Sequence, residues 1–200
     1  MVLGEVERVT NSHVYFVKGP LSQWYPSEFY GNDPMTSILG WTGKIHKYVN
    51  CEQWMMHGKA LFMKDFETAK LIMEATSAKK IKDLGREVKN YDEDIWDKVR
   101  FAVVVYGNYL KFNSDGDLEK FLASTEKRTL VEAAWYDSVW GVKLSQDDDL
   151  ILDENNWQGQ NLLGKALMIV RDNFEQWRDT ELEKLVQEVV NPFANTLRGS

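Results

Sequence analysis

Glu52 and Lys59 form the first pair of residues whose types and spacing could support chemistry. They lie seven positions apart, so on a helix their side chains point in nearly the same direction, about two turns apart, and Met56 lies between them. A nearby ammonium group lowers the pKa of a carboxyl group. The pair therefore suits a base or a stabiliser of positive charge. The alternative is a solvated stripe on the helix surface.

A second pair of carboxylates lies in the aromatic segment LVEAAWYDSVWG. Glu132 and Asp137 stand near Trp135, Tyr136 and Trp140. Acids among bulky aromatic rings are unfavourable unless they are paired or take part in chemistry. The alternative for Asp137 is hydrogen bonding to loop amides, an ordinary role of aspartate in turns. The sequence leaves both interpretations open.

Two arginines could bind an anionic group. Trp96 and Arg100 are four residues apart on one predicted helix face, where a guanidinium beside an indole makes a flat cationic surface for a phosphate or a planar ring. Arg86 follows Gly85 in the most basic part of the chain, which is consistent with a phosphate-binding edge. The structural alternatives are a core role for Trp96, an ion pair for Arg100, and a solvated charge run around Arg86.

The composition argues against several classes of protein. The 200 residues include 24 basic and 31 acidic side chains, a net charge of −7, which disfavours a general basic surface for nucleic acid. One cysteine and three isolated histidines disfavour a disulfide framework and a thiolate-rich zinc site. The chain has no apolar run long enough for a membrane span, no signal pattern at its start and no glycine-rich phosphate loop. We expect a cytoplasmic protein with no cofactor and no membrane partner.

The elements that must position these residues are mostly helices. Apolar periodicity and capping residues predict helices at 52–63, 66–75, 93–112, 117–124 and 160–174. Asn50 is expected to cap the first of them, and Ser114 and Asp117 the fourth. Strands are expected at 13–18, 45–50 and 129–135, a further extended piece within 136–142, and loops at 20–34 and 147–159.

The fold class that follows is α+β, a mainly helical single domain with a small β-sheet. We place this domain at 1–175. An amphipathic helical extension with a frayed tail is expected at 176–200.

Taken in order, several segments resemble the NADAR superfamily, also called YbiA-like. These segments are PLSQWYP, CEQWMMHGKA, AKKIKDLGREVKNYDEDIWDKVR, LKF, TLVEAAWYDSVWGV and NWQGQNLLGKALMIVR, within residues 19–171. The resemblance implies a YbiA-like fold and N-glycosidase activity, the hydrolysis of a bond between ribose and nitrogen. The substrates that it implies are ADP-ribosylated guanine, in a nucleotide or in DNA, or a ribosylaminopyrimidine phosphate of riboflavin synthesis.

The resemblance also assigns the candidate site, motif by motif. Glu52 and Lys59 match the family's helix glutamate and lysine, and Asp137 belongs to its acidic WG loop; these three are the expected catalytic residues. The expected substrate-binding residues are Arg86, Trp96, Arg100 and Trp140, which match family motifs, and Trp24, whose indole could stack on the base or sugar.

The chemistry of such a cleavage agrees with these residue types. Positive charge builds on the ribose, and Glu52 would stabilise it or act as a base while Asp137 positions water or the ribose hydroxyls. The tryptophans would stack on the base or sugar, and the arginines would bind phosphate. No metal is required. The whole prediction depends on the two carboxylates converging with indole rings on the anomeric carbon.

The chain departs from the family pattern in three places. Gln23 and Trp24 replace an asparagine and an aromatic after PLS. Gln53 and Trp54 replace a histidine and an aromatic in the helix motif, and EAAWYD stands where EASPYD is usual. The charged residues remain, so the resemblance supports the reaction class more strongly than the substrate.

Two other function classes stay open. If Lys59 pairs with Glu52 too tightly for reaction, the same pocket would bind ADP-ribose or a related nucleotide without cleaving it. The aromatic-rich surface would also serve an interaction protein. If the substrate is ADP-ribosylated DNA, the net charge of −7 predicts modest affinity for the unmodified polymer. The oligomeric state stays open.

Overall fold

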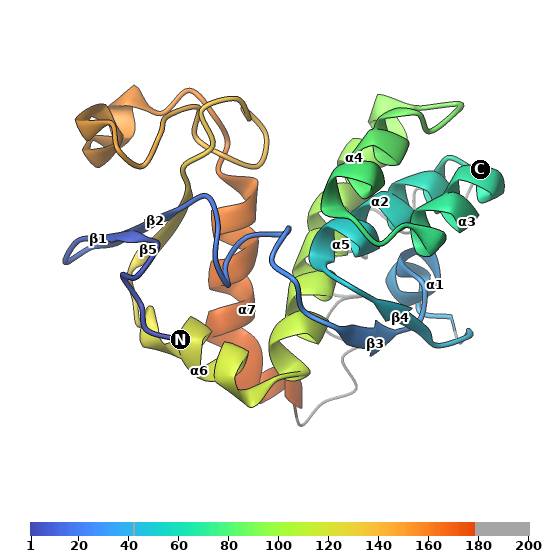
Figure 1. Ribbon diagram of the computed structural model, residues 1–200, viewed down its shortest axis with the longest axis horizontal. Coiled ribbons are helices and arrows are strands. Elements are labelled where there is room, and N and C mark those ends of the chain that lie inside the picture. The colour runs from blue at the N-terminus through green and yellow to red at the C-terminus, as the bar shows by residue number, and fades with distance from the viewer. Residues whose placement is uncertain (42, 179–200) are drawn as a thin grey trace. The chain divides into compact units, whose positions relative to one another are not determined.

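The computed structural model describes residues 1–41 and 43–178 (Figure 1). The chain forms two compact units: unit 1 is Met1–Tyr25 with Asp115–Asp172, and unit 2 is Pro26–Ser114 with the segment that starts at Asn173. Among the described residues, seven α-helices accompany a three-stranded and a two-stranded sheet. The predicted mainly helical α+β class is confirmed, with two small sheets where one was expected.

Unit 1 is built on the three-stranded sheet, in the order β1-β2-β5. β1 (Arg8–Val9) is antiparallel to β2 (His13–Phe16), and β2 is parallel to β5 (Thr129–Glu132). The side chains of one core cluster are Tyr15, Val131, Ala133, Val142 and Ile151. The unit also contains α6 (Gly116–Ser124), the 3-10 helices η1 (Asp149–Leu152) and η2 (Glu154–Asn156), and α7 (Leu162–Arg178) up to Asp172.

Unit 2 places four helices around α2. Its elements are β3 (Phe29–Gly31), α1 (Pro34–Leu39), β4 (His46–Tyr48), α2 (Cys51–Phe62), α3 (Phe66–Glu74), α4 (Ala78–Arg86) and α5 (Glu93–Asn113). Helix α2 packs against α1, α3, α4 and α5 (Figure 1). Because α2 is covered from several sides, its polar residues are buried along with its apolar ones. Glu52, a candidate site residue, is among these buried polar residues.

Local hydrogen bonds explain why the predicted helices begin where they do. The side chain of Asn50 accepts a hydrogen bond from the amide of Gln53 and caps α2, as expected. Asp92 caps α5 through the amide of Ile95. The predictions at 52–63, 66–75, 93–112 and 160–174 are confirmed to within a few residues at each end.

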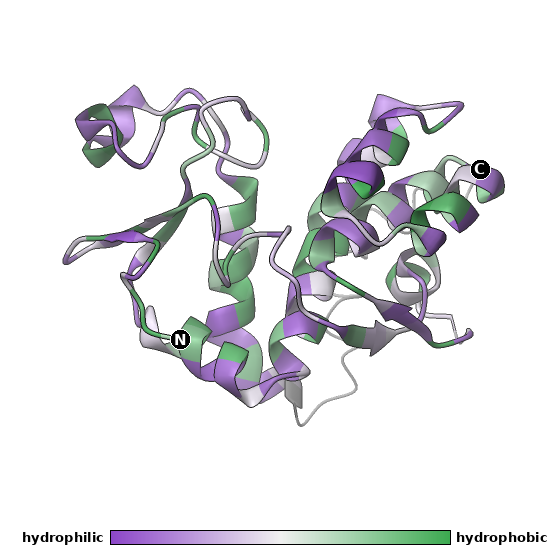
Figure 2. Ribbon diagram, in the orientation of Figure 1, coloured by the Kyte–Doolittle hydropathy of each residue, from purple (hydrophilic) through white to green (hydrophobic). Residues whose placement is uncertain are grey.

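Four elements differ from the prediction, because their sequence patterns indicate a helix or strand only weakly or indicate a loop instead. Helix α4 carries five charged residues out of nine and is mainly hydrophilic in Figure 2, so it was interpreted as a charge run; only Ile81, Leu84 and Gly85 on it are buried. The proline-rich stretch predicted as loop contains β3 and leads into α1 at Pro34, a favoured first helical position. The two-residue β1 was also missed.

Other expectations differ in detail. The α6 cap is Asp115, whose carboxylate accepts from the amides of Asp117 and Leu118; Ser114 and Asp117 do not cap it. Strand β5 ends at Glu132, and no strand forms within 136–142. The loop at 147–159 contains η1 and η2. Of the extension predicted at 176–200, residues 176–178 belong to α7 and 179–200 lie outside the described residues.

A buried ammonium group and a buried thiol make the stability of unit 2 depend on alkaline pH. Both Lys111 and Cys51 are buried in unit 2. Burial lowers the pKa of Lys111 from 10.5 to about 8 and raises the pKa of Cys51 from 9.0 to about 12. Between pH 8 and 9 the unfolded chain binds more protons at Lys111, so the free energy of unfolding should rise with pH. Above pH 9 the thiol of Cys51 opposes that rise, because it ionises more readily in the unfolded chain.

The two effects separate in single variants. In Cys51→Ala, the free energy of unfolding should continue to rise with pH through the whole range from about 8 to 10.5, by about 3 kcal/mol. Urea unfolding measured at intervals from pH 7.5 to 10 checks this. Lys111→Met should show no such rise, and an unchanged pH dependence in Lys111→Met would contradict the assignment.

Candidate functional site

The side chain of Gln53 joins the first turn of α2 to neighbouring segments. Its Oε1 accepts from the amide of Val49 at 2.9 Å, and its Nε2 donates to the carbonyls of Ile72 and Ala75 at 3.0 and 3.2 Å. The start of α2 is thereby tied to the end of α3. The glutamine that departs from the family pattern therefore positions its neighbour Glu52.

Glu52 is buried, with 3% of its surface exposed. It lies in the first turn of α2, where the helix dipole favours a carboxylate. Its charge raises the pKa of Lys59, two turns along the same helix. Because Glu52 is so little exposed, the alternative of a solvated stripe is wrong for this residue. A buried carboxylate that interacts with a lysine is a candidate functional group.

The ammonium group of Lys59 is held on two sides. Its Nζ donates to the carbonyl of Gly85 at 2.8 Å and lies 4.5 Å from the centre of the Tyr91 ring. Burial lowers the pKa of Lys59, and the charge of Glu52 opposes this shift. Lys59 is therefore fixed in place and loses its proton more easily than a lysine in water.

Gly85 allows α4 to approach α2 this closely. A Cβ at position 85 would overlap the Sδ of Met56, the residue between Glu52 and Lys59. The same glycine supplies the carbonyl that holds Lys59. Since Gly85 immediately precedes Arg86, the LGR motif positions Lys59 through its backbone.

The two arginines and Trp96 have different surroundings. Arg100 is partly buried and pairs with Asp97 at 2.7 Å, whereas Arg86 is exposed and lies 3.8 Å from Asp83. Trp96 is buried. Burial raises the pKa of the Tyr91 hydroxyl. The charge of Asp97 raises this pKa further, and the charge of Arg100 lowers it. Arg100 and Lys59 therefore both interact with Tyr91, and the phosphate and stacking roles stay predictions.

Tyr91 is a residue of the site that the sequence pattern does not indicate. It lies in the segment between α4 and α5, where its ring faces the ammonium of Lys59. A cation over an aromatic face gains electrostatic stabilisation. Nothing in the spacing of the two residues indicates the contact, since it depends on how this segment packs against α2.

In unit 1, Asp137 organises the loop after β5. Its Oδ1 accepts from the amides of Val139 and Trp140 at 2.9 and 2.8 Å, and its own amide donates to the carbonyl of Ala134 at 3.1 Å. Asp137 therefore binds loop amides within a turn, which is the alternative role that the sequence left open. The second oxygen, Oδ2, has no hydrogen-bond partner among the described residues, so the turn role leaves half of the carboxylate available for a ligand.

Two further residues hold the loop of Asp137 in place. Gly141 fits against Ala134, because a Cβ there would lie 2.9 Å from both the Ala134 Cβ and the Glu132 carbonyl. Asn161, at φ 51°, accepts from the Glu132 amide and donates to the Leu130 carbonyl. The WG and NWQGQN motifs thus have a structural role: they pin this loop to the end of β5.

The remaining predicted residues of unit 1 are partly exposed. Trp24 exposes 40% of its surface, and its amide donates to Ser22 Oγ at 3.2 Å. Trp140 is half-buried, and its amide is one of the two that bind Asp137. The stacking role of both tryptophans stays a prediction.

The structure groups the predicted site residues within units. In unit 2, Lys59 interacts electrostatically with Glu52 and contacts Gly85 and Tyr91. Arg100 interacts electrostatically with Tyr91. In unit 1, Asp137 and Trp140 share one loop. Because Glu52 and Asp137 belong to different units, their convergence stays a prediction.

No metal site emerges from the described part of the chain. Residues 1–41 and 43–178 contain no group of three histidine, cysteine, aspartate or glutamate side chains placed to hold a metal ion. His46 and His57, which look isolated in sequence, do lie with their ring centres 5.8 Å apart. Burial lowers the pKa of His57 to about 4. Within the same residues, no helix is long and apolar enough to cross a membrane.

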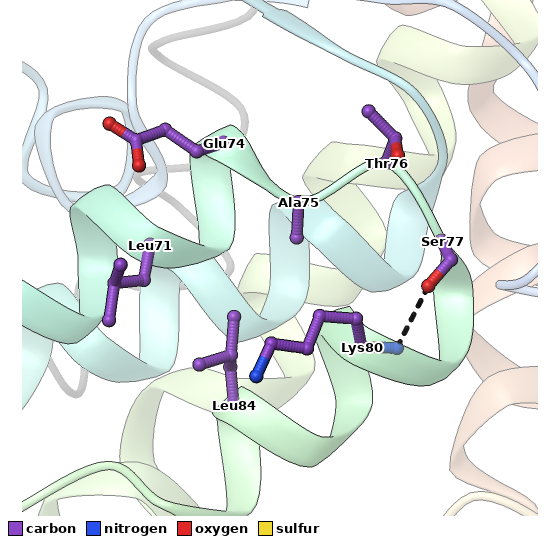
Figure 3. Close-up of a pocket in the computed structure, with 7 residues that line it drawn as sticks. All are labelled: Leu71, Glu74, Ala75, Thr76, Ser77, Lys80 and Leu84. Carbon is purple, nitrogen blue, oxygen red and sulfur yellow. Dashed lines mark hydrogen bonds between the residues drawn. The ribbon is translucent and has the colours of Figure 1, made fainter.

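A surface groove of about 350 Å³ lies where α3 gives way to α4 (Figure 3). Its wall includes Ser77, which caps α4 by accepting from the amide of Lys80 at 3.2 Å. The other lining residues are Leu71, Glu74, Ala75, Thr76, Lys80 and Leu84. No predicted site residue lines this groove.

Comparison with known proteins gives three consistent findings. The model of the NADAR domain matches residues 13–175, across both units. The chain is 42% identical to N-glycosidase R617 of Acanthamoeba polyphaga mimivirus over 157 residues, 78% of this chain and 87% of that protein. It is 32% identical to the protein irg-1 of Caenorhabditis elegans over 180 residues, 88% of this chain and 84% of that protein.

The fold has a solved counterpart. The NMR structure of the E. coli protein YbiA superposes with a TM-score of 0.64, at 18% identity, over 88% of this chain and 92% of that one. At that identity the likeness concerns the fold alone, and the predicted YbiA-like fold is confirmed.

Proposed function

This chain belongs to the NADAR domain family, and from that premise we propose that it is an N-glycosidase that hydrolyses a ribosyl–nitrogen bond. The observation that carries the proposal is the arrangement on α2: buried Glu52, 3% exposed, interacting electrostatically with Lys59, whose ammonium is held by the Gly85 carbonyl. The name of the mimivirus relative, 42% identical, supports the same reaction class.

Each group has a distinct part in the proposed reaction. As the bond between the anomeric carbon and nitrogen breaks, its electron pair leaves with the nitrogen, and the ribose acquires oxocarbenium character. The carboxylate of Glu52 stabilises that positive charge and takes a proton from the attacking water. The water oxygen forms the new bond to carbon, and the proton that Glu52 takes from this water passes to the departing nitrogen base directly or through solvent.

Lys59 and Asp137 assist this reaction. The ammonium of Lys59 interacts with the carboxylate of Glu52 and binds a substrate oxygen. The unoccupied Oδ2 of Asp137 accepts a hydrogen bond from a ribose hydroxyl or from the water, while its Oδ1 remains bound to the loop amides. Arg86 and Arg100 bind phosphate, and Trp24, Trp96 and Trp140 contact the base or sugar. These steps need no metal, so a chelator should leave turnover unchanged.

The proposed substrate classes are guanine carrying ADP-ribose, free or in DNA, and a ribosylaminopyrimidine phosphate. The direct test incubates the purified protein with each and identifies the released products by mass spectrometry. Free ADP-ribose with intact guanine, or ribose phosphate with a free pyrimidine, would support the proposal and choose between the classes. Calorimetric binding of ADP-ribose, with no product from either substrate after long incubation, would instead support a binding module.

A further inference from the structure

Trp135 and Tyr136 present two aromatic rings to solvent from one turn. Trp135 exposes 67% of its surface and Tyr136 56%. Their ring centres are 5.6 Å apart and the rings meet edge to face, at 89°. Of the tryptophans that the structure describes, Trp135 is the most exposed. Single exposed apolar residues are common, but two adjacent large rings in mutual contact form a patch that calls for an explanation.

The turn that carries this pair is held firmly. The preceding residue, Ala134, is buried in unit 1. The following residue, Asp137, closes the turn through its amide bond to the Ala134 carbonyl at 3.1 Å and binds two further amides through Oδ1. The rings are therefore held outside by the backbone on both sides. Leaving so much apolar surface in water forfeits hydrophobic stabilisation, which indicates a use in binding.

The neighbouring carboxylate indicates what the rings bind. Asp137 follows Tyr136 directly, about 3.8 Å along the backbone, and its Oδ2 is not engaged in the turn. A nucleoside joins a flat heteroaromatic ring to a ribose with hydroxyl donors, so it matches aromatic rings next to a carboxylate oxygen. Protein aromatic rings stack on nucleobases of any sequence because every base has a π-face.

We propose that Trp135 and Tyr136 form a stacking site for a nucleobase of the substrate, beside the ribose that Asp137 contacts. The inference rests on the proposed function for the identity of the ligand and on the turn for its geometry. Trp135 stands at the position where the family commonly has proline, in EASPYD. A tryptophan there adds a large stacking surface, so Trp135 is a specificity-determining residue of this chain.

Calorimetric titration tests the site with ADP-ribose, which carries adenine, with a short guanine-containing single-stranded DNA, and with ribose 5-phosphate, which has no base. Trp135→Ala should weaken binding of at least one base-containing ligand roughly 5- to 150-fold, the loss of one stacked base. Binding of ribose 5-phosphate should not change. Trp135→Phe, which keeps a ring, should recover most of the affinity.

Trp41→Ala is the matched control, since Trp41 is another exposed tryptophan, at 54%, and belongs to unit 2. It should leave all three affinities unchanged. A loss confined to ADP-ribose identifies the adenine as the stacked ring, and a loss confined to DNA identifies a base of the polymer. Three outcomes would overturn the inference. They are a wild type without base-dependent binding, equal affinities in the wild type and Trp135→Ala, and an equal loss of affinity in Trp41→Ala.

These titrations do not depend on turnover. A wild-type protein that hydrolyses its substrate while Trp135→Ala binds normally would remove the stacking site and leave the N-glycosidase proposal standing. If the wild type releases no product but Trp135→Ala loses base-dependent affinity, the stacking site would stand and the N-glycosidase proposal would fall.

Discussion

Glu52→Gln should lower the turnover number by a factor of about 10²–10⁴, the usual contribution of a positioned acid or base. The substitution keeps the size of the side chain but removes the negative charge that faces the developing positive charge on ribose. It also removes the base that accepts a proton from water. Glutamine has nearly the same shape as glutamate, so the fold should remain intact, which circular dichroism of the variant checks. Product release under saturating substrate measures the effect.

Glu67→Gln is the matched control for this variant. Glu67 occupies the second position of α3, as Glu52 does in α2, and both residues follow a capped helix start. Glu67 is exposed, however, and its ion pair is the surface contact with Lys89. Both variants lose a favourable charge near a helix N-terminus, but only Glu52→Gln should lose activity. Near-wild-type hydrolysis by Glu52→Gln would discard the proposed role.

Lys59→Met should lower the turnover number by about 10²–10³, the size of effect seen when one electrostatic stabiliser is removed. Methionine fills similar space but supplies neither the charge that interacts with Glu52 nor the donor that binds the Gly85 carbonyl. The Michaelis constant and the turnover number should be measured together. Lys44→Met, at an exposed lysine of unit 2, should leave both unchanged.

The pH dependence gives a separate test of Lys59. Burial lowers its pKa from the usual 10.5, and the charged form is present only below the pKa. If the ammonium form is the working one, the rate of the wild type should fall as pH rises, at a pH below 10.5. In Lys59→Arg, whatever activity remains should persist to higher pH, since arginine keeps its proton. A wild-type rate that rises through this range would assign the role to the neutral amine instead.

Much of α2 was predictable from local sequence. Asn50, Glu52 and Lys59 predict where the helix begins and which residues share a face, because capping bonds and the helical repeat involve residues only a few positions apart. The turn role of Asp137 was foreseen as an alternative for the same reason: its two amide partners lie two and three residues away.

The partners of Lys59 could not be predicted in this way. The Gly85 carbonyl is 26 residues from Lys59, and Tyr91 is more distant still along the chain. Helix α4, which delivers Gly85, was itself missed because its charged residues obscure an apolar side of three residues. These contacts depend on helix packing, in which Gly85 has room for Met56 only because it lacks a side chain.

The sequence alone determined the family resemblance, the α+β class and the spacing of Glu52 and Lys59, since these depend on residue identity and short-range geometry. Only the tertiary structure decided that Glu52 is buried, that Lys59 is bound between Gly85 and Tyr91, and that Trp135 is exposed on a fixed turn. The burial and the electrostatic environment of a residue depend on segments that are distant in the chain. The pattern of neighbouring residues does not indicate which segments will cover that residue.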